Sequence, residues 1–144
     1  MALAIAGLIL GVVIPSAWNF YESSQYRKAV RDLSVAAAAA RYRAITSGIP
    51  QDVVLQPSER RYLLRRSGEG IREGAYQRLP AAVTVSAITA AEVNPRSGLA
   101  GIRFYPDGSS SGGSISVRRG SEAGDGGVRL RVDWLLGSVS QEPL

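Results

Sequence analysis

The sequence predicts an α+β protein in which a long N-terminal α-helix packs on an antiparallel β-sheet domain. Three observations predict it: an apolar N-terminal run, a 3.6-residue apolar period that ends near Pro50, and a series of short strand-like segments after it. About 100 residues remain beyond such a helix, which is enough for one small core. We therefore divide the chain into a hydrophobic half-helix (1–21), an amphipathic half-helix (22–48) and a β-rich domain (49–144).

Residues 2–14 (ALAIAGLILGVVI) carry no charged or polar side chain. Thirteen helical residues span about 20 Å, whereas the hydrocarbon core of a bilayer is about 30 Å thick. Pro15 should kink or interrupt the helix, and Trp18 and Tyr21 follow where an anchor would reach the membrane interface. The run predicts a shortened membrane and assembly helix formed by Ala2, Leu3, Ile5, Gly7, Leu8, Leu10, Gly11, Val13, Ile14 and Pro15.

The glycines of this run, Gly7 and Gly11, lie four residues apart. Such a pair allows a neighbouring helix to approach closely, although glycine is also simply tolerated in lipid. Both interpretations stay open.

The second half of the helix is predicted from apolar residues that recur at spacings of three and four, namely Tyr26, Val30, Leu33, Ala37, Ala40 and Ala44. The opposite face carries the charged residues Arg27, Lys28, Arg31, Asp32, Arg41 and Arg43. Small alanines favour the helix and let a sheet approach its axis closely. Gly48 and Pro50 indicate where the helix ends.

After Pro50 the apolar period changes from 3.6 to two. Strands are expected at 52–56, 61–66, 81–89, 101–105, 114–118 and 128–135, with a hairpin turn at 122–127. Phe104 and Trp134 fall within these strands and are expected in the core. Asp107 and Gly108 predict a turn, because Asp bonds the backbone two residues on and Gly accepts positive φ. Ser109–Gly113 is expected to form a mobile, hydroxyl-rich loop.

The composition argues against catalysis, a cofactor or a metal site. The chain has no cysteine and no histidine, so the commonest general base and the commonest metal ligands are missing. A phosphate site at Ser109–Gly113 is disfavoured, because no Gly-Lys-Ser/Thr follows it and the next segment is a strand rather than a helix. Glu122 and Asp125 do not have the spacing of a calcium loop. The net charge of +5, almost entirely from arginine, is most simply explained by solvated faces and strand edges.

Two parts of the chain resemble one family. Residues 2–15, continuing into an Ala-rich helix, resemble a type IV pilin-like N-terminus. Residues 102–115 (IRFYPDGSSSGGSI) and 132–139 (VDWLLGSV) resemble the C-terminal half of the minor pseudopilin GspH, in the GspH/FimT group. The family-signature hairpin is formed by Phe104, Pro106, Asp107, Gly108, Ser109, Ser110, Ser111, Gly112 and Gly113.

The resemblance implies a structural role in type II secretion. Such a subunit assembles with the major pseudopilin and other minor pseudopilins near the tip of a pseudopilus, which drives folded proteins through the outer-membrane secretin. It also implies a single pass through inner-membrane lipid, with the globular domain in the periplasm. A simple count of positive charges would place Arg27, Lys28 and Arg31 in the cytoplasm, so the periplasmic expectation rests on the resemblance.

The chain departs from the family pattern at its N-terminus. The basic leader, its cleavage site and the Phe-Thr-Leu-Ile-Glu-like stretch with the assembly glutamate have no counterpart. About seven more apolar residues would bring the run to the length of a spanning helix. We therefore expect that the chain begins at an internal start or was trimmed.

Two other functions stay open. A FimT-like minor pilin that binds DNA for uptake shares the fold, but residues 137–144 contain no basic side chain. DNA binding would be expected to depend on Arg118 and Arg119 and on salt. A secreted enzyme with residues 2–14 as its signal peptide is disfavoured, because no basic segment precedes the run and no convincing cleavage site follows it.

Overall fold

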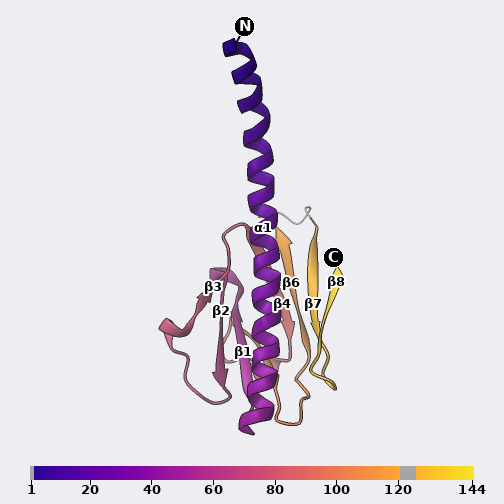
Figure 1. The fold of residues 1–144 in the computed structure, drawn as a ribbon. Coiled ribbons are helices and arrows are strands. Elements are labelled where there is room, and N and C mark those ends of the chain that lie inside the picture. Colours follow the sequence, from indigo (N-terminus) through magenta and orange to yellow (C-terminus); the bar gives the residue numbers. More distant parts are fainter. Residues whose placement is uncertain (1, 121–125) are drawn as a thin grey trace.

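The computed structural model describes the backbone of residues 2–120 and 126–144, and confirms the α+β class. One long helix, α1 (Ala2–Ser47), is followed by eight strands and three short 3₁₀ segments, η1 (Pro57–Glu59), η2 (Glu73–Ala75) and η3 (Ala91–Val93). Figure 1 shows the first half of α1 projecting beyond the globular domain, while the second half lies along the strands.

The strands form two four-stranded antiparallel sheets rather than one. The first sheet has the order β3-β2-β1-β5, with β1 (Gln51–Gln56), β2 (Arg61–Arg66), β3 (Gln77–Arg78) and β5 (Ala100–Phe104). The second has the order β4-β6-β7-β8, with β4 (Val83–Thr89), β6 (Gly113–Arg119), β7 (Gly127–Val132) and β8 (Val139–Pro143). The chain passes from the first sheet to the second between β3 and β4 and returns to the first sheet between β4 and β5. It enters the second sheet again between β5 and β6.

The predicted strands are largely found, with differences at the C-terminal end. The strand expected to reach residue 135 stops at Val132, because the chain turns at Asp133. Strand β8 was missed, since Val139–Pro143 has no alternating apolar pattern and ends in proline. Most of the turn expected at 122–127 lies outside the described residues.

Helix α1 continues through Pro15 without interruption, so the predicted interruption there is wrong. A proline removes one backbone donor and crowds the preceding turn, but the hydrogen bonds further along the helix on either side remain possible.

The amphipathic half of α1 is confirmed. The six residues predicted to form its apolar stripe are all buried, and Ala40 and Ala44 are completely inaccessible. They share one core with β1 and β5 of the first sheet and with β4, β6 and β7 of the second. The helix therefore holds the two sheets together, and its alanines allow that contact to be close.

Enlarging one of these alanines should destabilise the protein. Ala40→Leu adds three carbon atoms to a side chain that is completely buried. Overpacking of this kind lowers the free energy of unfolding by about 2 kcal/mol. The matched control is Ala38→Leu, because Ala38 lies exposed on the same helix and surface changes cost about 0.5 kcal/mol or less. Urea denaturation measures the free energy of unfolding of both variants. An equal decrease for Ala40→Leu and Ala38→Leu would contradict the packing described.

A buried carboxylate on β1 forms ion pairs with both neighbouring strands of the first sheet. Asp52 is fully buried on β1 and lies directly opposite Arg65 of β2 and Arg103 of β5. Its Oδ1 accepts from Arg103 Nε at 2.8 Å, and its Oδ2 is 3.4 Å from an Arg65 nitrogen. The bond to Asp52 raises the pKa of the Arg103 guanidinium, which stays charged. This triad links three adjacent strands of the sheet, β2, β1 and β5.

Candidate assembly surfaces

The first candidate surface is the projecting half of α1. The described part of the chain contains no helix with both the length and the apolar character needed to cross a membrane. Where the helix enters the domain, the side chains of Phe20 and Tyr21 are 71% and 58% exposed. Aromatic side chains of this kind favour a membrane–water boundary or a protein neighbour. The assembly role of Ala2–Pro15 stays a prediction.

The second candidate surface is an apolar stripe on the outer side of α1, which was not predicted. Its large side chains are all exposed and are separated by spacings of seven and three: Val35, Tyr42 and Ile45. These spacings place them on one face, opposite the buried alanines. The sequence predicted this face from its charged residues alone, whereas it also exposes large apolar side chains.

The predicted turn at Asp107 and Gly108 is confirmed. Oδ1 of Asp107 accepts from the Ser109 hydroxyl at 2.6 Å and from the Ser109 backbone N–H at 2.9 Å. These bonds lower the pKa of the Asp107 carboxyl. Gly108 has φ +90°, a conformation that favours glycine. Phe104, just before the turn, is completely buried as expected.

Ser110 and Ser111 of the signature segment form hydrogen bonds to the backbone of other segments, although a mobile loop was expected here. The Ser110 hydroxyl is buried and donates to the carbonyl of Asp133 at 2.8 Å, and the Ser110 N–H donates to the carbonyl of Trp134 at 2.8 Å. Ser111 exchanges two bonds with the backbone of Arg103. The segment thus connects β5 of one sheet to β6 of the other, and its hydroxyls hold the connection in place.

Helix α1 joins this connection through Arg41. Nε of Arg41 donates to the carbonyl of Gly108 at 3.1 Å. Gly137, which has φ +64°, lies against the same groups: a Cβ there would be 2.2 Å from the Gly108 carbonyl oxygen and 3.1 Å from Arg41. Arg41 was predicted only as part of a charged face. In the fold it holds the helix, the signature segment and the final turn together.

The turn between β7 and β8 exposes three consecutive apolar side chains. Trp134, Leu135 and Leu136 are 66%, 61% and 62% exposed. The expectation that Trp134 lies in the core is therefore wrong, because the strand ends before it. The flanking Asp133 and Gly137 are the signal in the sequence that indicates a turn here.

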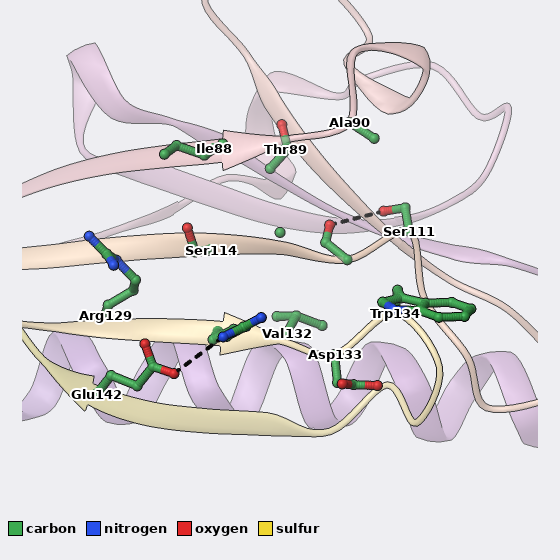
Figure 2. A pocket seen from close by; sticks show the side chains of 13 residues that line it. Ile88, Thr89, Ala90, Ser111, Ser114, Arg129, Val132, Asp133, Trp134 and Glu142 are labelled. Carbon is green, nitrogen blue, oxygen red and sulfur yellow. Dashed lines mark hydrogen bonds and ion pairs between the residues drawn. The ribbon is translucent and has the colours of Figure 1, made fainter.

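A hollow of about 550 Å³ adjoins this turn on the outer face of the second sheet (Figure 2). Figure 2 shows Trp134 at one end, Arg129 at the other and Ser114 between them. Arg131 forms a long ion pair of 3.7 Å with Glu142 and remains 68% exposed. Nowhere in residues 2–120 and 126–144 do three or more His, Cys, Asp or Glu side chains gather as they would around a metal ion.

The arginines proposed to test DNA binding lie at the end of β6. The Arg119 guanidinium stacks over the ring of Tyr26 at 4.8 Å from its centre, and thus packs against α1. Arg118 lies opposite Thr84 and Gly127 in the sheet. The phenol of Tyr26 is partly desolvated, and this burial raises its pKa.

Comparisons with known proteins agree with this architecture. A family model described as type II transport protein GspH matches residues 29–136. The type II secretion system protein H of Xanthomonas campestris pv. campestris is 28% identical over 142 residues, covering 99% of this chain and 76% of that protein.

Solved structures of two kinds share the fold. One is the minor pseudopilin EpsH of the Vibrio cholerae type II secretion system (TM-score 0.62, 11% identity, 82% of this chain and 93% of that one). The other is the type IV minor pilin FimU of Pseudomonas aeruginosa (TM-score 0.63, 16% identity, 86% and 92%). The family model spans well over half of the sequence and includes most of the helix stripe, the first sheet, strands β4, β6 and β7 of the second sheet, and Trp134. The chain therefore belongs to the GspH family of type II transport proteins.

Proposed function

We propose that this protein is a structural minor pseudopilin of a type II secretion system. In this role it assembles near the tip of a periplasmic pseudopilus with the major pseudopilin and other minor pseudopilins, and helps to drive folded proteins through the outer-membrane secretin. Its globular domain lies in the periplasm and the first half of α1 associates with inner-membrane lipid. The observation that carries the proposal is the GspH match across residues 29–136.

The geometry supports a role in assembly. Helix α1 projects from the domain (Figure 1), so its first half is free to pack among neighbouring helices. The outer stripe on α1 and the turn at Trp134 expose large apolar side chains, as interaction surfaces do. The polar side chains of the signature segment are used to hold the fold together.

The test is a deletion of the gene in its host, with secretion and DNA uptake measured in parallel. We expect the exported enzymes to accumulate in the periplasm, DNA uptake to stay at the parental level, and the wild-type gene to restore secretion. Loss of DNA uptake with normal secretion would contradict the proposal and favour the FimT-like function. Salt-dependent DNA binding that is lost in Arg118→Gln/Arg119→Gln would point the same way.

A further inference from the structure

We propose that the turn Trp134–Leu136 is a preformed docking knob, which inserts into an apolar pocket with an acidic rim on a neighbouring, different pilin-like subunit. The inference rests on the proposed function and adds to it the surface and the chemistry of one partner. It starts from the exposure of three consecutive large apolar side chains, 66%, 61% and 62%, on a single turn. Contiguous exposed apolar surface of this kind is typical of interaction sites.

The backbone under the knob is fixed before any partner arrives. Oδ1 of Asp133 accepts from the N–H groups of Leu135 and Leu136 at 2.8 and 2.7 Å. Asp133 also exchanges backbone bonds with Gly137 and Ser138, both at 2.9 Å.

The signature segment supports the knob from the other side. Ser110 donates two bonds to the carbonyls of Asp133 and Trp134, both at 2.8 Å. Gly112 allows close approach, because a Cβ there would lie 3.2 Å from Cβ of Trp134. A rigid knob loses little conformational entropy on binding, so most of its apolar burial is available as affinity. Tryptophan is the residue type that most often dominates such contacts.

The charges beside the knob indicate the partner's rim. Arg129 and Arg131 line the adjoining hollow together with Glu142. The Asp133 carboxylate is already engaged by the turn, and Glu142 is 3.7 Å from Arg131. Two guanidinium groups thus share one carboxylate, that of Glu142, which leaves an excess of positive charge. A pocket edged by carboxylates complements it.

The position of the knob favours a different subunit over a second copy. The turn lies at the end of the domain away from the projecting half of α1 (Figure 1). Insertion of the knob into a pocket joins two unlike surfaces, and between identical chains such a contact would continue head to tail without closing. The net charge of +5 also repels a second copy. We therefore assign the knob to a single acidic pilin-like neighbour.

The experiment places a photo-activated cross-linking amino acid at Leu135 of the full chain, in the host bacterium. The control position is Arg72, which is exposed at the start of η2, in the other sheet's half of the domain. Cross-linked products are identified by mass spectrometry. We expect a product with another pilin-like subunit of the same system from Leu135 and not from Arg72.

A second arm adds Trp134→Ser to the chain that carries the cross-linker at Leu135. The expected loss of product is about thirtyfold, as for removal of a dominant contact. Surface substitutions change stability little, and thermal unfolding verifies that the variant is folded. If it is not, Leu136→Asp replaces it, with the same expectation.

Three outcomes would overturn the inference: no product from Leu135, a product with a second copy of this chain, or equal products from Leu135 and Arg72. A product that survives the substitution in a folded variant would also overturn it. Failure here is distinguishable from failure of the proposed function, because secretion and cross-links through the first half of α1 would then persist.

Discussion

Gly137→Ala should destabilise the protein by about 4 kcal/mol, enough to unfold much of a marginally stable domain. Two costs add at this position. The residue has φ +64°, which an alanine adopts only with strain, and the new Cβ would lie 2.2 Å from the Gly108 carbonyl oxygen. Backbone carbonyls on a fixed turn cannot move aside as a side chain can. The substitution should therefore separate the final turn from the signature segment and from Arg41.

Gly48→Ala is the matched control for this prediction. Gly48 has a nearly identical φ of +68°, but no atom lies within 4 Å of the position of its Cβ. It carries the conformational cost alone, about 1 kcal/mol. Urea denaturation of both variants separates the two costs. A similar decrease in unfolding free energy for Gly48→Ala and Gly137→Ala would show that the close contact at Gly137 does not affect stability.

Asp52→Ala should cost about 3–5 kcal/mol of unfolding free energy. The reason is what remains: the guanidinium groups of Arg65 and Arg103 would stay partly buried, 13% and 27% exposed, with no carboxylate between them. Two like charges on neighbouring strands would then repel each other through a medium of low dielectric constant. The loss should be felt across β1, β2 and β5 together.

The control for Asp52 is Glu142→Ala. Glu142 is 43% exposed and lies 3.7 Å from Arg131, so its ion pair is screened by water and salt. Its removal should cost about 1 kcal/mol or less. Chemical denaturation in low and high salt checks the comparison. A loss at Asp52 as small as that at Glu142 would mean that the triad contributes no more than a surface pair.

The parts of the fold that follow from local pattern could be predicted from the sequence. The buried stripe of α1 needed only its spacing, and the turn at Asp107 and Gly108 needed only the chemistry of those two residues. The split into two sheets could not be predicted, because the local pattern of a strand does not specify which other strands it pairs with. The register that places Asp52 between two arginines depends on pairings between distant segments.

The surfaces were harder to predict for a different reason. A tryptophan in an apolar run is usually buried, so Trp134 was expected in the core, but Asp133 ends the strand one residue earlier. The outer stripe of α1 was hidden by the charged residues on the same side of the helix. The exposure of Trp134 depends on where β7 ends, and that of the outer stripe depends on which side of α1 the sheets cover. Local composition determines neither.

We propose that this chain is a structural subunit that assembles through the first half of α1. The most direct measurement is cross-linking in the host bacterium from a photo-activated amino acid at Leu10, with Arg72 of the globular domain as the comparison. We expect a product that joins Leu10 to the major pseudopilin or another minor pseudopilin, in cells that are secreting. No pilin-like product from Leu10, or the same products from Leu10 and Arg72, would contradict it.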